Sequence, residues 1–98
     1  MRVRDPIDFQ PYRVPWRVDR VHDSHPLVTN GSDEPADAVR IFRADTAAER
    51  ADTAHWGRLL PGDTAELCLC DADLDSTVVT VCWFRPTTGQ EYAWRFVM

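Results

Sequence analysis

The strongest hydrophobic pattern lies in two alternating stretches near the end of the sequence. Val78–Arg85 and Gln90–Val97 flank a turn at Pro86–Gly89, and each alternates large apolar residues with polar or small ones. A period of two is typical of half-buried strands, so these stretches predict a β-hairpin. We expect Arg85 to pair with Gln90, which fixes every other facing pair in the hairpin.

This register places six bulky side chains on one face of the hairpin. The facing pairs are Val79 with Phe96, Val81 with Trp94, and Trp83 with Tyr92. A shift of one residue would mix this set with the polar one, so the pattern itself selects the register. We therefore predict that these six side chains belong to the core and do not form a binding platform.

Five shorter stretches predict the remaining strands. They cover residues 14–22, 25–29, 37–43, 56–60 and 64–70. In the second of them we expect Leu27 to point inward. Two turns separate these stretches: Asn30-Gly31, which suits positive φ angles, and Pro61-Gly62, which suits positions two and three of a β-turn.

The segment between residues 44 and 55 has a weaker pattern. It is rich in alanine and aspartate and carries few large apolar side chains. We predict a loop here, and the capping box of Thr46 and Glu49 allows one short helix near residues 46–54. About seven short strands with regular turn signals predict an all-β fold, an antiparallel β-sandwich.

The chain length suits one domain. Residues 1–13 contain Pro6 and Pro11 beside aromatic side chains, and we predict an extended proline-rich N-terminal arm there. The β-sandwich domain is expected to span residues 14–98.

Three segments carry a resemblance to a known family. They are His25–Gly31 followed by Ala36–Phe42, Leu60–Leu67 with its Pro-Gly turn, and Val79–Trp83 with Gly89–Phe96. Together they resemble the bacterial immunoglobulin-like β-sandwich domains of adhesin, transport and cell-surface accessory proteins. The resemblance implies a fold and no activity. The sequence departs from antibody-type domains because no cysteine pair brackets a central tryptophan at their usual spacing.

The charge and hydropathy of the chain restrict its partners. The net charge is −5, and all eleven basic residues are arginine, a bias typical of bacteria with high-GC genomes. An acidic domain is repelled by phosphate backbones, so no nucleic-acid partner is expected. No apolar run reaches the roughly 20 residues that span a bilayer, and no signal peptide is visible. We expect a cytoplasmic protein that does not bind a membrane.

Histidines and cysteines are the candidate chemical groups. His22, His25 and His55 offer imidazoles, but a zinc site needs further ligands, and a polar turn is the alternative for the first two. Cys68, Cys70 and Cys82 are interpreted as small apolar side chains that face outward. A disulfide, a metal site or a catalytic thiol is the alternative for the cysteines.

Two further motifs resemble known sites only in part. Asp71, Asp73 and Asp75 begin like a calcium loop, but Ser76 stands where the motif needs glycine. Asn30-Gly-Ser matches a glycosylation sequon and is interpreted as a turn. We therefore assign no catalytic, cofactor-binding or metal-binding residue, and we expect no cofactor.

These observations favour a non-enzymatic protein-interaction or assembly module of a bacterium. No catalytic set is present, whereas a sandwich presents edges and loops to partners. We expect a protein partner or self-association as a homodimer, through the N-terminal arm or an edge strand. The alternative is a small metal-binding or metal-dependent protein that uses His22, His25, His55 or the cysteines.

Overall fold

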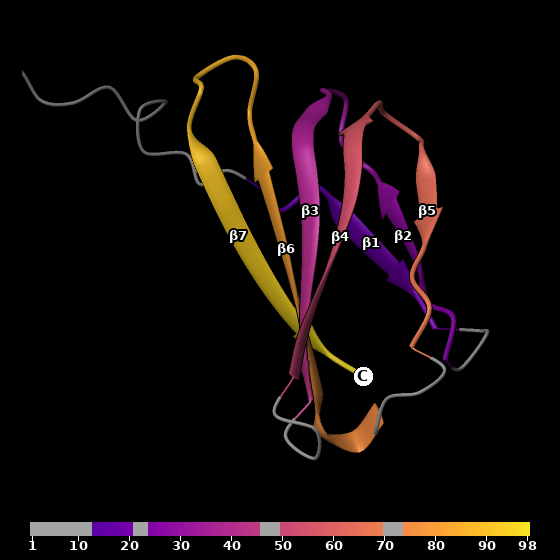
Figure 1. Cartoon of the computed structure of the whole chain (residues 1–98). Helices are drawn as coiled ribbons and strands as arrows, with labels where there is room; N and C mark the ends of the chain where they lie inside the picture. Colours follow the sequence, from indigo (N-terminus) through magenta and orange to yellow (C-terminus); the bar gives the residue numbers. More distant parts are fainter. Residues whose placement is uncertain (1–12, 21–23, 46–49, 70–73) are drawn as a thin grey trace, which may run out of the picture.

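Seven β-strands and one short 3-10 helix make up the described chain (Figure 1). The structure, a computed structural model, describes residues 13–20, 24–45, 50–69 and 74–98. The strands are β1 (Trp16–Asp19), β2 (Leu27–Asn30), β3 (Ala36–Asp45), β4 (Arg50–Leu59), β5 (Thr64–Glu66), β6 (Thr77–Phe84) and β7 (Glu91–Val97), and the helix is η2 (Leu74–Ser76). The predicted N-terminal arm, residues 1–13, lies outside the described residues except for Arg13.

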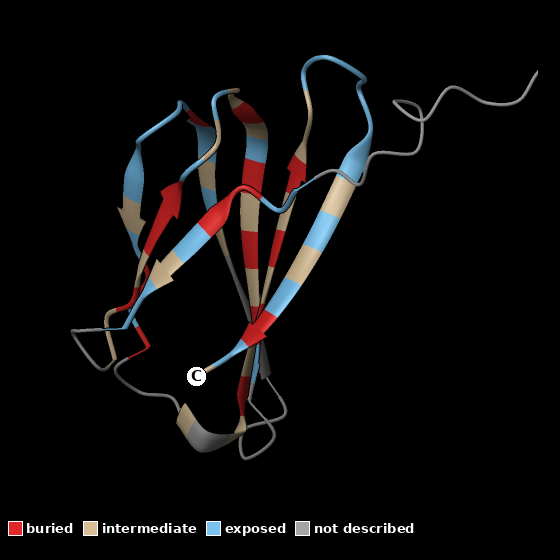
Figure 2. Cartoon of the chain, turned by 180° about the vertical axis from the view of Figure 1, so that it is seen from behind, coloured by how far each residue is buried: buried red, intermediate tan, exposed pale blue. Residues whose placement is uncertain are grey.

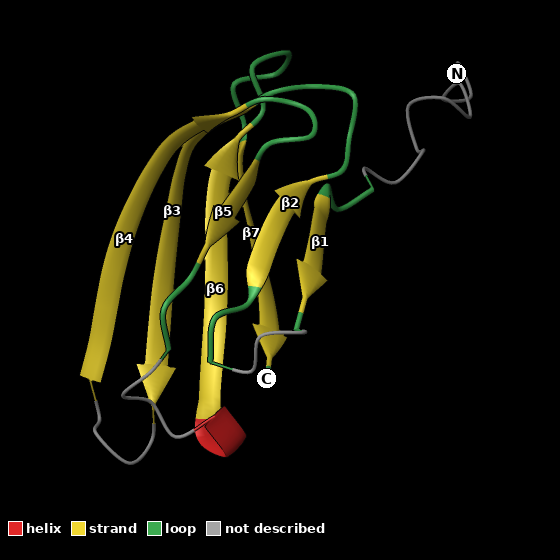
Figure 3. Ribbon diagram, turned by 90° about the vertical axis from the view of Figure 1, so that its right-hand side faces the viewer, coloured by secondary structure: helices red, strands yellow, loops and turns green. Residues whose placement is uncertain are grey.

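The strands form two antiparallel sheets. Sheet A has three strands in the order β1-β2-β5, and sheet B has four in the order β4-β3-β6-β7. Figure 3 shows sheet A lying across one face of sheet B. The predicted all-β sandwich of about seven antiparallel strands is therefore confirmed.

The β6–β7 hairpin has the predicted register. Val79 pairs with Phe96, Val81 with Trp94, and Trp83 with Tyr92, without a register shift. Gly89 closes the turn at a φ of 71°, which suits glycine because it lacks a Cβ. The alternating side chains and the turn chemistry agree on one pairing.

The core lies between the two sheets. Its buried apolar side chains are Trp16, Val28, Ala36, Val39, Ile41, Leu59, Leu67, Leu69, Val79, Val81, Trp83 and Phe96. Trp16 from sheet A meets Trp83 from sheet B edge to face, with ring centroids 5.3 Å apart. This geometry is a favoured one for aromatic pairs, because the ring edge is electropositive and the ring face electronegative.

The prediction that all six hairpin side chains are core is only partly right. Val79, Val81, Trp83 and Phe96 are buried, but Tyr92 and Trp94 are half-buried. Figure 2 shows buried positions alternating along β6, whereas β7 is mostly exposed or half-buried. The reason is position: β7 lies at one edge of sheet B and has a neighbouring strand on one side only, whereas β6 lies between β3 and β7.

The prediction of a loop or short helix in the segment 44–55 is wrong for its described residues. Residues 44–45 extend β3, and 50–55 belong to β4, which pairs with β3 from Asp45↔Arg50 onward. Residues 46–49 lie outside the described part. Alanine and aspartate have low strand propensity, so pairing with β3 supplies the order that the local sequence does not favour.

Two predictions of local geometry also differ from the structure. Val28 is fully buried while Leu27 is half-buried, so the inward residue of β2 is one position later than expected. Asn30 and Gly31 do not have positive φ angles. Gly31 instead allows a close approach, because a Cβ there would lie 3.2 Å from Nη1 of Arg17. The Pro61-Gly62 turn is confirmed: Asp63 N donates to Leu60 O at 2.9 Å, with Gly62 at a φ of 86°.

Candidate functional site

The structure separates the histidines that the alternative hypothesis would combine. His25 precedes β2 in sheet A, and its Nδ1 lies 2.6 Å from Oε2 of Glu66 on β5. His55 lies on β4 in sheet B, where it is exposed and faces Arg40. His22 is outside the described residues. Within the described ranges, no three histidine, cysteine or carboxylate side chains are grouped to hold a metal ion.

The cysteines lie on different strands and in different surroundings. Cys68 is exposed just after β5, as expected from the burial of its neighbours Leu67 and Leu69. Cys82 is half-buried on β6, in the other sheet. Among the described residues, neither thiol takes part in a disulfide. Cys70 lies outside the described residues, as do Asp71 and Asp73 of the partial calcium motif.

A buried asparagine organises one end of the sandwich. Asn30 is fully buried, and its side-chain Nδ2 donates to the backbone oxygens of Glu34 at 2.9 Å and Leu59 at 3.0 Å. Its Oδ1 accepts from the backbone nitrogen of Ser32 at 3.0 Å and from Ser32 Oγ at 2.7 Å. The Asn30 side chain thus builds the bend that follows β2 and joins β2, the 31–35 loop and β4, without the positive φ angles predicted for a tight turn.

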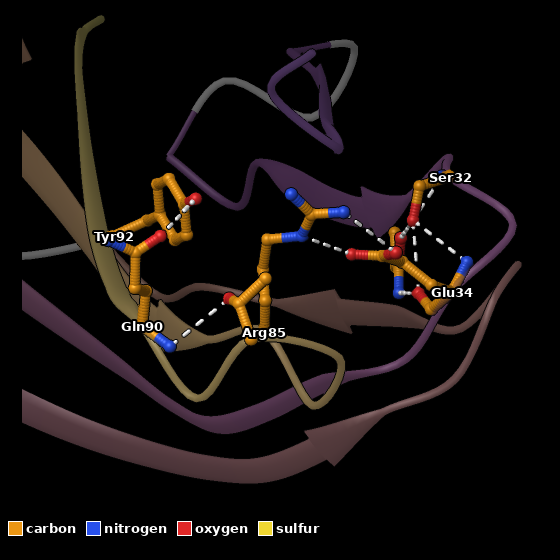
Figure 4. Close-up of polar contacts among 7 residues, drawn as sticks. Ser32, Glu34, Arg85, Gln90 and Tyr92 are labelled. Atoms are coloured by element: carbon orange, nitrogen blue, oxygen red, sulfur yellow. Dashed lines mark hydrogen bonds and ion pairs between the residues drawn. The ribbon is translucent and has the colours of Figure 1, made fainter. Parts of the chain in front are cut away.

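The same loop is tied to sheet B by an ion pair. Arg85 Nε donates to Glu34 Oε1 at 2.7 Å, and Arg85 Nη2 donates to Oε2 at 3.1 Å (Figure 4). A depression of about 460 Å³ beside them is lined by Arg13, Gly31, Ser32, Asp33, Glu34 and Arg85. Two arginines and two carboxylates line the depression, so its charges balance, and the bidentate contact of Arg85 with Glu34 holds the loop against sheet B.

The outer face of sheet B points away from sheet A and, unlike the charged depression beside Glu34 and Arg85, carries many apolar side chains. It is formed by the alternate residues of β3, β6 and β7 that do not enter the core. Its apolar or small members are Phe42, Ala44, Val78, Thr80, Cys82, Phe84, Ala93 and Val97. Ala44 and Ala93 are exposed, and Val97 is 64% exposed.

A shallow depression lies within this outer face. It has a volume of about 340 Å³ and is lined by Phe42, Arg43, Ala44, Val78, Thr80 and Arg95. Charged groups occupy the face at its sides, where Arg40 forms an ion pair with Glu91 and covers the Phe84 ring at 5.4 Å. The arrangement is an apolar centre with a charged margin, which is the organisation of protein-protein interfaces.

The hairpin register already places this face opposite the core, and the sequence favours it, with the loops and the N-terminal arm, as the place of any recognition surface. What the sequence analysis did not recognise is the apolar character of its outward side chains. The outward positions of β6 are Val78, Thr80, Cys82 and Phe84, and all four are half-buried. A solvent-facing strand is expected to carry polar residues at these positions. The signal was therefore present in the sequence as a strand whose outward positions, except Thr80, are also apolar.

Comparison with known proteins gives no relative: no protein-family model, no curated protein and no solved structure matches the chain. Across the described ranges, no helix has the length and apolar character needed to span a bilayer.

Proposed function

We propose that this domain is a non-enzymatic protein-interaction or assembly module that binds its partner through the outer face of sheet B. The observation that carries the proposal is the apolar centre of that face. Water-facing sheet surfaces of soluble domains are mostly polar, and contiguous apolar patches on them mark interaction sites. The charged margin formed by Arg40 and Glu91 would orient the partner.

The immunoglobulin-like type of the sandwich belongs to the same proposal. The order β4-β3-β6-β7 corresponds to the C′-C-F-G sheet of immunoglobulin variable-type domains, and β1-β2-β5 corresponds to their A-B-E strands. Domains of this architecture commonly serve recognition and assembly, a likeness that concerns the fold and not the site. A bacterial source and a cytoplasmic location remain part of this proposal.

The test places a charge in the centre of the outer face. Val78→Glu and Ala44→Glu each introduce a carboxylate at an outward position, and Leu60→Glu is the matched control because Leu60 is 49% exposed in the Pro61-Gly62 turn. The wild-type chain is used to capture proteins from a lysate of the source cells, and each captured protein is identified and purified. Each is then titrated against the wild type and the three variants. We expect the face variants to weaken binding at least tenfold and the control to bind like wild type.

Two outcomes would overturn the proposal. One is a captured partner that binds Val78→Glu and Ala44→Glu as tightly as wild type while both variants keep the wild-type melting temperature. The other is the absence of any partner that binds again after purification.

A further inference from the structure

The four edge strands of the two sheets differ in how well they are protected against pairing with another strand. In sheet A, β1 has four residues and β5 has three. In sheet B, β4 pairs with β3 through two register shifts near Val39, opposite Gly57 at a φ of 72°. Short length and bulges are the usual protections of an edge. By contrast, β7 has seven residues, no proline and no register shift in its pairing with β6.

The backbone groups on the outer side of β7 can be assigned. Arg85 N donates to Gln90 O at 3.0 Å, so Gln90 directs its backbone groups toward β6. Antiparallel pairs alternate, and therefore Tyr92 and Trp94 also bond toward β6 while Glu91, Ala93 and Arg95 direct theirs away from it. The Val97 carbonyl, which has the same outward direction, accepts a hydrogen bond from Arg20 at 3.2 Å. The segment Glu91–Arg95 pairs with no other described strand on that side.

The side chains of this segment complement a second copy of themselves. Glu91 and Arg95 lie on the outer face of sheet B, two positions on either side of Ala93. If two copies of β7 pair antiparallel with Ala93 opposite Ala93, each Glu91 faces an Arg95. Arg95 makes no ion pair with any described residue, and Glu91 contacts Arg40 through only one of its two carboxylate oxygens. Pairing the strands would therefore add two cross-strand ion pairs.

The opposite face of β7 supports the same register. Tyr92 and Trp94 are half-buried there. In the proposed register, Tyr92 of each copy would face Trp94 of the other. These pairs fall at the non-hydrogen-bonded positions, where facing side chains approach most closely. The contact would cover the two aromatic side chains that sheet A leaves half-exposed.

Other registers fit less well. Centring the pairing on Trp94 places Glu91 opposite Val97, whose carbonyl already accepts from Arg20, and gives no ion pair. Centring it on Arg95 places two like charges opposite each other, which is destabilising. The charges thus select Ala93 as the centre.

We propose that β7 pairs antiparallel with β7 of a second copy about Ala93, which joins the two B sheets into one continuous sheet. The proposal rests on the proposed function and deepens it, because it names a second copy of this chain as one partner. The pairing would also join the outer faces of the two copies into one surface. The partner proposed for the outer face would then meet a twofold assembly.

Sedimentation analysis of the full chain over concentrations up to about 1 mM tests the dimer. The wild type is expected to form dimers. Arg95→Glu and Glu91→Arg each turn both attractive pairs into repulsive ones, and we expect each to weaken dimerisation roughly tenfold or more. Arg58→Glu is the matched control, since Arg58 on β4 forms an exposed ion pair with Asp37 at 2.8 Å. It should leave the dimer unchanged.

Mixing the two edge variants gives the sharpest result. Arg95→Glu carries two acidic groups on its β7 edge and Glu91→Arg carries two basic groups, so the mixture restores both attractive pairs. We expect a heterodimer in the mixture at concentrations where neither variant pairs with itself. Should Glu91→Arg lose its fold with its Arg40 contact, Arg95→Glu alone decides, because Arg95 is exposed.

A wild-type monomer at the highest concentration would overturn the proposal, as would a dimer that Arg95→Glu leaves intact or that Arg58→Glu dissociates. These results leave the proposed function standing if Val78→Glu and Ala44→Glu still weaken partner binding at least tenfold. Conversely, if a β7 dimer forms but no partner binds the outer face, the proposed function is wrong and the β7 pairing still stands.

Discussion

The two strands of the β6–β7 hairpin carry the same sequence pattern and have very different surroundings. Val79, Val81 and Trp83 on β6 are at most 1% exposed. Their partners Trp94 and Tyr92 on β7 are half-buried, although each faces a fully buried residue across the hairpin. The difference follows from sheet order, since β6 lies between β3 and β7 while β7 lies at the margin.

Alternation along a strand determines which face a side chain occupies, but not how deeply it is buried. Trp83 is enclosed by Trp16 from sheet A and by Tyr92, whose ring stacks on it at 5.8 Å. Trp94 has Phe96 at 5.3 Å, but it lies on the strand nearest the open edge. Large aromatic side chains at a margin retain surface that a partner can cover.

The largest expected effect is the loss of the central tryptophan. Trp83→Ala removes a side chain that is 1% exposed and leaves a cavity between the sheets. We expect the free energy of unfolding to fall by about 3–5 kcal/mol, measured by urea denaturation of dilute protein. A loss below about 1 kcal/mol would show that the core does not centre on β6.

Neighbouring valines on β6 give a second test within one strand. Val79→Thr places a hydroxyl in the fully buried core and is expected to cost about 2 kcal/mol. Val78→Thr makes the same change on the outer face and should cost no more than about 0.5 kcal/mol. Equal costs in urea unfolding would mean that the two faces of β6 are not distinct.

The tryptophan of β7 sharpens the contrast with β6. Trp94→Ala removes a half-buried ring, so we expect a cost of about 1–2 kcal/mol in the dilute monomer. The same variant should lose more stability at high concentration, relative to wild type, because the β7 pairing would bury the ring. A cost equal to that of Trp83→Ala would refute the marginal position of β7.

The smallest expected effects concern the ion pairs near the two strands. Glu34→Gln weakens the bidentate contact between Glu34 and Arg85, whose side chains are only 21% and 22% exposed, respectively. We expect the free energy of unfolding to fall by about 1 kcal/mol. Glu91→Gln weakens the Arg40 contact, where Glu91 is 47% exposed, and should cost no more than about 0.5 kcal/mol in dilute protein. Thermal unfolding of both variants checks this order, and the reverse order would contradict it.

Much of the fold was predictable because its signals are local. The hairpin register followed from bulky residues at every second position, and the turns at Pro61-Gly62 and Gly89 followed from their backbone requirements. The strand at residues 50–55 was not predictable, because its alanine and aspartate side chains have low strand propensity and its order comes from pairing with β3.

Long-range features escaped the sequence for the same reason. Asn30 in an Asn-Gly pair predicts a turn, but its buried contact with Leu59 O depends on a strand 29 residues away. The positive φ of Ala38, 49°, belongs to the bulge between β3 and β4 and carries no local sequence mark. The outer face of sheet B was visible as a pattern, yet its meaning required the strand order to exclude it from the core.

Amide hydrogen exchange along β7, recorded at low and high protein concentration, tests directly whether the open edge of this strand pairs with a second copy. The amides of Tyr92 and Trp94 bond toward β6 and should be protected at both concentrations. The amides of Glu91, Ala93 and Arg95 point to the open edge, so they should exchange rapidly in dilute protein and become protected as the concentration rises. Rapid exchange of these three amides at every concentration, or protection that does not change with concentration, would contradict the pairing of β7 with a second copy.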